Sequence, residues 1–189
     1  MEVNKIKVEH GAPSSQEGRA DRELRCYLAL DNLGISYERA DHNAAHTMED
    51  CLAVEEALGV KIPKNLLLCN RQQTDFYLLM LPGDKVFKTK DISQQLNTAR
   101  LSFATEEHMV RFLDIYPGSL SVLGLVNDKD HNVRLVVDKD VLDCEYIGCH
   151  PCVNTSTLAI RTEDIINKFV SSVGHSVTVV TLPEHTDEE

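Results

Sequence analysis

Hydrophobic residues at helical spacing open the ordered part of the chain. Leucines and one tyrosine recur at this spacing between positions 24 and 33, and Gly34 follows them as a stop. The pattern therefore predicts a helix over residues 20–33. Threonines and acidic residues precede further apolar stripes, which is typical of helix starts. Those stripes predict helices over residues 47–58, 105–113 and 162–173, and a shorter helix is predicted over residues 91–96.

Apolar runs without helical spacing predict strands. Residues 66–68 and 76–81 flank the polar segment 70–75, which is the pattern of a β-hairpin. Further strands are predicted over residues 35–39, 122–126, 133–137, 146–147, 155–160 and 177–182. Because strands arrive in runs and do not alternate strictly with helices, the chain is expected to be an α+β protein with a mixed sheet.

Both ends of the chain differ from the part between them. Residues 1–19 contain glycine, proline and serine without apolar periodicity, so we expect a flexible N-terminal arm. Residues 183–189 form an acidic tail, and residues 20–182 are expected to form one domain. No run approaches the roughly 20 apolar residues that span a bilayer, and the start lacks a secretory signal. We therefore expect a cytoplasmic protein without a membrane partner.

Charge argues against one class of nucleic-acid-binding protein. The chain has 19 basic and 30 acidic residues, a net charge of −11, which opposes a sequence-blind coating of duplex DNA. Residues 61–100 depart from this balance because they contain basic residues in excess of acidic ones. This segment is where a phosphate chain fits best. The absence of tryptophan and the low aromatic content weaken any proposal of base-stacking platforms.

Two clusters of residues suggest redox or metal chemistry, and both have a simpler interpretation. Cys149 and Cys152 have the C-x-x-C spacing of a redox pair or half a zinc site, but they lie late in the chain, and no second such pair exists. Two thiols on a tight loop are the favoured interpretation. Asp41, His42 and His46 resemble a metal cluster, yet their segment also fits a polar loop that leads into a helix. No metal or cofactor is expected.

Two loops and one lysine are better candidates for a functional site. The segment from Gly148 to Thr155 combines glycine, histidine, proline, asparagine and threonine ahead of a strand, and such a loop can clamp a small polar group. Pro117-Gly118-Ser119 is a second loop of this kind. Lys64 places an ammonium group at the entrance of a predicted strand, with Asn65 beside it. A turn that satisfies only its own backbone and a surface lysine remain the alternative interpretations.

Seven segments occur along the chain in a recognisable order: Lys64-Asn-Leu-Leu-Leu68, Phe76 to Leu81, Leu101-Ser-Phe-Ala104, Pro117-Gly-Ser119, Gly124-Leu-Val-Asn-Asp128, Val136-Val-Asp-Lys139 and Gly148-x-His-Pro-x-x-Asn-Thr155. In type and order they resemble the YbaK/ProX family of aminoacyl-tRNA editing domains. The closest resemblance is to free-standing prolyl-tRNA synthetase associated domain proteins, and it covers about residues 20–182. The resemblance implies a mixed, partly barrel-like sheet flanked by helices.

The resemblance also implies a reaction. Such enzymes hydrolyse the ester between a wrong amino acid and tRNA, typically alanine on proline tRNA, without a metal. It implies catalytic roles for Lys64 and His150, and its substrate-binding residues correspond here to Asn65, Gly118, Ser119, Gly148, Cys149, Asn154 and Thr155. Backbone N–H groups of glycine loops can stabilise an oxyanion. Lys64 can hold the terminal phosphate or orient the ester. His150 is the side-chain alternative for activating the water, or it can donate to the acyl carbonyl or position its loop.

The expected partners and the rival hypotheses follow from the same resemblance. The partner is tRNA with an aminoacylated 3′ end, with prolyl-tRNA synthetase or an elongation factor as a second partner, and DNA is excluded. The family resemblance favours water activated by the ribose hydroxyl of the substrate. Cys149 and Cys152 depart from the family pattern, which leaves the preferred amino acid open. A catalytically inactive module that binds tRNA or a synthetase is the alternative function.

Overall fold

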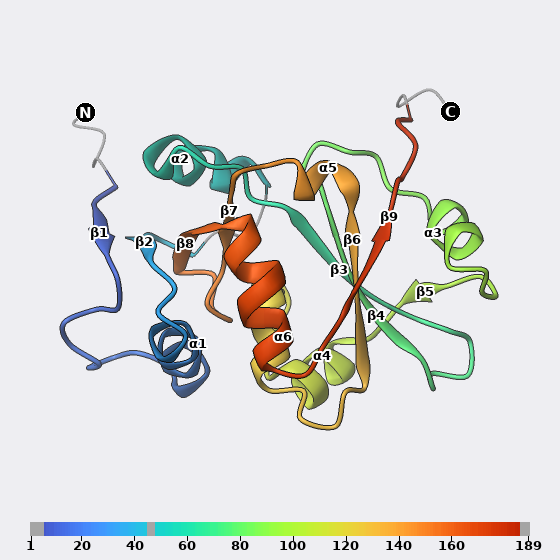
Figure 1. Ribbon diagram of the computed structural model, residues 1–189, viewed down its shortest axis with the longest axis horizontal. Helices are drawn as coiled ribbons and strands as arrows, with labels where there is room; N and C mark the ends of the chain where they lie inside the picture. Colours follow the sequence, from blue (N-terminus) through green and yellow to red (C-terminus); the bar gives the residue numbers. More distant parts are fainter. Residues whose placement is uncertain (1–5, 45–47, 186–189) are drawn as a thin grey trace.

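The structure is a computed structural model that describes residues 6–44 and 48–185. Two sheets surrounded by helices make up this part of the chain (Figure 1). Sheet A is antiparallel and has the strand order β1 (Val8–His10), β2 (Tyr37–Asp41), β8 (Ser156–Arg161) and β7 (Tyr146–Cys149). Sheet B has the order β5 (Ser102–Phe103), β3 (Lys64–Cys69), β4 (Phe76–Leu81), β6 (Val133–Asp138) and β9 (Val177–Val180). The expected α+β class with a mixed sheet is confirmed.

Sheet B contains both strand orientations. The β3–β4 hairpin is antiparallel, as predicted, and its register pairs Lys64 with Leu81. β4, β6 and β9 are parallel to one another. The edge strand β7 of sheet A meets the segment before β3 through a parallel bridge between Ile147 and Lys61, and the Gly148 N–H donates to the Lys61 carbonyl at 2.8 Å. This junction accounts for the barrel-like character, although the strands that the structure describes do not close a barrel.

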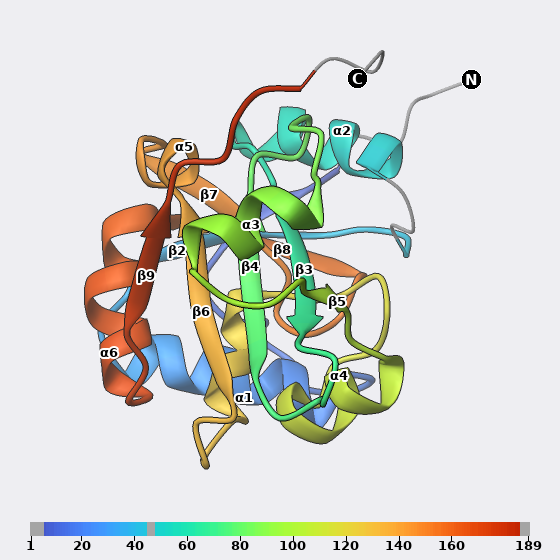
Figure 2. The same cartoon turned by 90° about the vertical axis from the view of Figure 1, so that its right-hand side faces the viewer.

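The helices pack against the two sheets and contribute to three apolar clusters. The helical elements are α1 (Asp21–Asn32), α2 (Met48–Leu58), α3 (Thr89–Gln95), α4 (Glu106–Leu113), the 3₁₀ helix η1 (Val122–Val126), α5 (Lys139–Leu142), the π-helical η2 (Asp164–Phe169) and α6 (Val170–Ser172). The largest core lies between the two sheets and includes residues of α1 and η1. α3 packs on the other face of sheet B, and α2 on sheet A (Figure 2). Among the described residues, no helix has the length and apolar character needed to cross a bilayer.

One predicted strand is wrong. Residues 122–126 form η1, although a buried apolar run of this length also fits a strand. The Ser121 hydroxyl accepts the Leu123 N–H at 3.2 Å and caps the first turn of η1. Gly124 lies so close to the Ile115 side chain that a methyl group on it would come within 2.4 Å. A capped turn and a tight approach therefore override the strand pattern.

The predicted flexible arm contains a short strand. Residues 8–10 pair with β2, and the buried Arg39 side chain binds both Glu9 and the Gly11 carbonyl, the latter at 2.7 Å. Residues 8–10 of the predicted flexible arm therefore form an edge strand, and the flexibility of residues 1–19 remains a prediction. At the other end, Glu184 lies 3.6 Å from the Lys85 ammonium. Residues 186–189 of the predicted acidic tail lie outside the described residues.

Candidate functional site

His150 lies at the end of β7 and is held in one tautomer. Its ring is 8% exposed, and its Nδ1 lies 2.9 Å from the Ser156 carbonyl oxygen. Because a carbonyl oxygen only accepts, Nδ1 carries the proton and Nε2 is left as an acceptor. Burial lowers the pKa of His150, and the nearby His42 lowers it further, against the opposite effect of the bond to Ser156. His150 is therefore a neutral base at neutral pH.

A second histidine reaches His150 through a buried threonine. The His42 Nδ1 donates to the Asn43 carbonyl at 2.7 Å, so its Nε2 accepts the Thr157 hydroxyl at 2.9 Å. The Thr157 oxygen also lies 3.2 Å from Nδ1 of His150, and the two imidazole rings are 6.2 Å apart. Sequence reasoning did not single out Thr157, and it placed His42 in a possible metal cluster. In the structure His42 instead belongs to a hydrogen-bonded chain that runs through Thr157 to His150.

The end of β2, next to His42, is held by a network of charges. Arg19 donates two hydrogen bonds to Asp41, at 2.9 and 2.6 Å, and a third to Glu23. Burial raises the pKa of Asp41, but the hydrogen bonds and charges of Arg19 and Arg39 outweigh this effect and lower it to about 2. Asp41 is thus an ionised partner of arginines, which leaves its carboxylate poorly suited to the metal cluster considered from sequence. His46 lies outside the described residues.

The two glycine loops lie close to each other. Gly118 has a φ of +87°, and a methyl group built on it would lie 3.6 Å from the side-chain nitrogen of Asn154. The Gly118 N–H forms no hydrogen bond with any residue that the structure describes, so it is open to a ligand oxygen. The Ser119 hydroxyl and N–H both donate to the Tyr116 carbonyl, at 2.9 and 3.2 Å. Ser119 therefore shapes the turn that presents Gly118.

Other residues of the 148–155 loop are already committed to the protein. The Gly148 N–H donates to Lys61, so this donor is not available to an oxyanion. The Cys149 thiol packs in the core between the sheets, and burial raises its pKa to about 12. Thr155 is exposed, and its carbonyl accepts the His42 N–H at 3.0 Å. These residues build the loop, and their assignment to substrate binding remains a prediction.

Lys64 and Asn65 lie on opposite faces of sheet B. Side chains alternate along a strand, and Leu66 and Leu68 pack under α3 while Leu67 packs between the sheets. By this alternation Lys64 lies on the α3 face, where its half-buried ammonium donates to the Lys85 carbonyl at 3.0 Å. Asn65 lies on the face toward sheet A. Its amide nitrogen donates to the Pro63 carbonyl at 3.1 Å, and its buried Oδ1 has no donor among the described residues.

The carbonyl that binds Lys64 is itself fixed by a buried cation. Lys85 is 3% exposed, and its ammonium donates to Asp138 at 3.0 Å, to Asp140 at 2.6 Å and to the Leu182 carbonyl at 3.0 Å. These contacts tie the loop after β4 to β6 and to the chain that follows β9. Sequence reasoning counted Lys85 only as one charge of a basic segment. Its partners Asp138 and Asp140 lie more than 50 positions away, so no local pattern indicated a buried ion cluster.

The cysteine hypotheses are not favoured by the geometry. The Cys152 thiol lies 3.4 Å from that of Cys26 on α1, and both are buried. The contact of Cys152 is therefore with α1 and not with Cys149. The described residues contain no group of three or more metal-binding side chains that could hold an ion.

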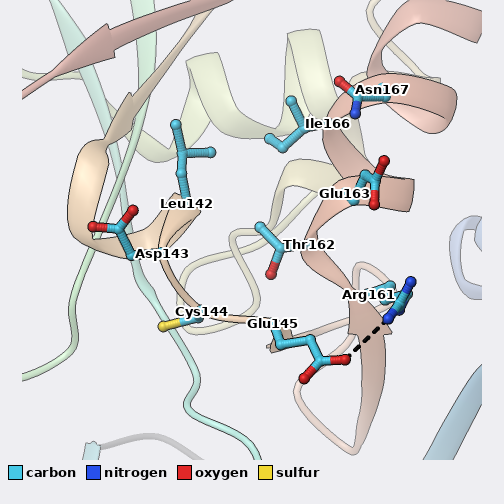
Figure 3. Close-up of a pocket in the computed structure, with 9 residues that line it drawn as sticks. All are labelled: Leu142, Asp143, Cys144, Glu145, Arg161, Thr162, Glu163, Ile166 and Asn167. Carbon is cyan, nitrogen blue, oxygen red and sulfur yellow. Dashed lines mark hydrogen bonds and ion pairs between the residues drawn. The ribbon is translucent and has the colours of Figure 1, made fainter.

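A separate cavity of about 380 Å³ lies near the other end of β7 and β8 (Figure 3). Arg161 and Glu145 form an ion pair of 2.9 Å at its side, and Thr162 and Ile166 also line it. The strand register pairs Tyr146 with Arg161 at this end and Cys149 with Leu158 beside His150. None of the predicted site residues lines this cavity, so it is distinct from the candidate site.

Comparison with known proteins shows which family the chain resembles. The model of the aminoacyl-tRNA editing domain matches residues 42–168. The chain is 28% identical to prolyl-tRNA editing protein ProX of Acetoanaerobium sticklandii, over 86% of this chain and 98% of that protein. It is 29% identical to prolyl-tRNA synthetase associated domain-containing protein 1 of Bos taurus, over 85% and 96%.

A solved structure has the same fold. This crystal structure, described as a "putative trans-editing enzyme for prolyl tRNA synthetase", superposes with a TM-score of 0.65 and 16% identity, over 88% of this chain and 99% of that one. The family match extends from His42 to Lys168 and so includes both glycine loops, the Lys64–Asn65 pair and His150. The chain belongs to the aminoacyl-tRNA editing domain family and is an aminoacyl-tRNA deacylase.

Proposed function

We propose that this protein removes alanine from alanyl-tRNA specific for proline, acting in trans and without a metal ion. The names of its relatives, which refer to prolyl-tRNA editing and to the prolyl-tRNA synthetase, support proline tRNA as the RNA. The nearness of the Gly118 turn to the Asn154 side chain supports a small acyl group, since a methyl group built on Gly118 already reaches van der Waals distance of that side chain. Steric exclusion of the proline ring then gives the selectivity, since one methylene of attraction discriminates by only about 1–3 kcal/mol.

The observation that carries the proposal is the pair of side chains at the start of β3. Lys64 lies on the α3 face of sheet B with its ammonium half-buried. Asn65 lies on the face toward sheet A, and its buried side-chain oxygen has no donor among the described residues. A buried, unsatisfied acceptor is costly unless a ligand completes it. We assign Asn65 to a donor of the substrate, its α-ammonium or ribose hydroxyl. Two roles were left open for Lys64. Its position on the α3 face, away from Asn65, favours binding of the terminal phosphate.

The reaction needs few groups from the protein. A water oxygen bonds to the acyl carbon, the bond from that carbon to the ribose oxygen breaks, and the ribose oxygen takes up a proton. In this proposal the Gly118 N–H, unpaired among the described residues, stabilises the oxyanion formed on the acyl oxygen, which such donors do by roughly 3 kcal/mol. His150 cannot donate through Nε2 in its tautomer. It therefore accepts a hydrogen bond, either from the α-ammonium or from the attacking water that the ribose hydroxyl activates.

The test is single-turnover hydrolysis of alanyl-tRNA(Pro) in the presence of EDTA. The wild-type protein is expected to release alanine far faster than the uncatalysed control. Lys64→Ala and Asn65→Ala are expected to lose at least about tenfold in rate, since each removes one charged or buried polar contact. Lys61→Ala is the matched control, because this exposed lysine of the same segment binds Glu55 at 3.1 Å. Full activity in Lys64→Ala, or complete inhibition by EDTA, contradicts the proposal.

A further inference from the structure

A wide hollow lies at the β5 edge of sheet B, apart from His150 and the glycine loops. Its volume is about 920 Å³, and its lining comes from the turn after β3, the start of α3 and strand β5. Figure 2 shows α3 in front of sheet B with β5 beside it. β5 is an edge strand, so the hollow opens at a border of the sheet. We call it the basic hollow, after the four cations that line it: Arg71, Lys88, Lys90 and Arg100.

The charges of the basic hollow are not neutralised by the protein. None of its four cations forms a hydrogen bond or an ion pair with another described residue, and no carboxylate lines it. Most other cations that the structure describes are paired, such as Arg25 with Asp114 and Lys61 with Glu55. In a chain with a net charge of −11, four unpaired cations in one place create a local positive potential. Such a potential attracts phosphate groups.

The basic hollow also presents an aromatic face. Phe103 is 61% exposed, and the half-buried Phe87 meets it edge to face at a centroid distance of 6.1 Å. Phe103 is one of few large hydrophobic side chains that are exposed among the described residues. Cations around an exposed ring are the combination that binds single-stranded nucleic acid, with phosphates on the cations and a base stacked on the ring. Duplex grooves are read by other geometries.

The basic hollow continues from the position proposed for the substrate's end. The Lys64 ammonium binds the Lys85 carbonyl, and Phe87 and Lys88 follow two and three residues later. Three residues of extended chain span about 10 Å at most. A strand whose last phosphate lies at Lys64 therefore reaches the basic hollow within a few nucleotides.

We propose that the basic hollow binds the unpaired nucleotides that precede the aminoacylated adenosine of tRNA. The backbone phosphates lie along the four cations, and one base stacks on Phe103. This inference rests on the proposed function, because it takes the Lys64 end of the hollow as the position of the terminal adenosine. Since phosphates and a π-face carry no base code, the contact adds affinity without selecting a particular tRNA sequence.

The test measures binding of uncharged tRNA(Pro), labelled with fluorescein, by anisotropy over a range of salt concentrations. Lys88→Ala with Arg100→Ala is expected to weaken binding about tenfold or more and to reduce the slope of log K against log salt by about 1.4, since single strands lose about 0.7 per phosphate contact. Arg111→Ala with Lys129→Ala is the matched control, with one exposed arginine and one exposed lysine removed elsewhere. This control is expected to bind like the wild type.

Two further arms test the aromatic contact and the RNA segment. Phe103→Ala is expected to weaken binding about fivefold or more, while Tyr146→Ala, which removes an exposed ring from β7, changes it little. A transcript without its unpaired 3′ nucleotides is expected to bind the wild type weakly and to be insensitive to the Lys88/Arg100 substitutions. Wild-type affinity in the Lys88/Arg100 variant, or an equal loss in the Arg111/Lys129 control, overturns the inference.

The inference and the proposed function fail separately. Uncharged tRNA has no ester, so the binding assay does not depend on hydrolysis. A protein that binds this RNA through the basic hollow but hydrolyses no alanyl-tRNA supports the inference and contradicts the proposed function. A protein that hydrolyses alanyl-tRNA, but whose RNA binding does not change when the basic hollow is altered, supports the proposed function and overturns the inference.

Discussion

Replacement of Lys85 by methionine tests the buried ion cluster that supports the site. The Lys85 ammonium contacts Asp138, which is fully buried, and Asp140, whose side chain is 47% exposed. Methionine keeps most of the aliphatic stem, so the substitution removes the charge and its three hydrogen bonds without opening a large void. The Asp138 carboxylate then loses its cation in the interior. It keeps the Asp140 N–H, which it accepts at 3.1 Å.

The expected loss is large because only one partner is removed. A buried charge left without its partner costs about 3–5 kcal/mol, whereas an exposed ion pair contributes about 0–1 kcal/mol. Asp138 is the buried charge, and the Lys85–Asp140 pair is partly exposed. We therefore expect Lys85→Met to lower the free energy of unfolding by about 3–5 kcal/mol. Lys85→Met with Asp138→Asn, which removes both buried charges, is expected to lose clearly less.

The assay is urea denaturation at pH 7, followed by circular dichroism. Lys139→Met is the matched control, since this lysine pairs with Asp143 at 2.5 Å on the surface and its loss is expected to leave the urea midpoint nearly unchanged. A loss below about 1 kcal/mol for Lys85→Met would refute the reasoning. It would mean that the Asp138 carboxylate is solvated or protonated and that the cluster does not fix the Lys85 loop.

The remaining predictions concern thiols, acid and one glycine. Native protein is expected to react quickly with a thiol reagent at the half-buried Cys144, and the other five thiols, all buried, are expected to react only on unfolding; several fast thiols would contradict their burial. Because the pKa of His150 is lowered on folding, its contribution to stability is full above its ordinary value of 6.5 and is lost as the pH falls below it. The urea midpoint of the wild type should therefore drop between pH 7 and 5 by more than that of His150→Gln, and equal drops would contradict the assigned environment. Gly118→Ala is expected to cost about 1–2 kcal/mol of stability and to reduce alanyl-tRNA hydrolysis, whereas Gly59→Ala, at a φ of +67° with open space around it, costs the same stability and leaves the rate unchanged. Equal rates in the two glycine variants would show that Gly118 does not border the substrate.

Local patterns predicted most of the elements, because their signals lie within a few residues. The hairpin of β3 and β4 and the capped helix α4 follow directly from strand runs and helix starts. The run from Val122 to Val126 misled because periodicity cannot separate a buried strand from a buried turn. The close approach of Gly124 to Ile115 is a tertiary contact that the local pattern does not indicate.

The sequence proposed residues for the candidate site but gave no arrangement for them. Lys64 and His150 were identified because the matching segments keep their order along the chain. The relay from His42 to Thr157 joins residues that are 115 positions apart, and no local pattern indicates it. Strand alternation, once the register is known, separates Lys64 from Asn65. The sequence alone could only place these two side chains next to each other.

Amino-acid selectivity is the most direct test of the account. Purified protein is incubated with alanyl-tRNA(Pro) and, separately, with prolyl-tRNA(Pro) at equal concentrations, and the initial rate of amino-acid release is measured. The account predicts release of alanine well above the spontaneous rate and release of proline at the spontaneous rate. Equal release of both amino acids, or release of neither above the spontaneous rate, would contradict it.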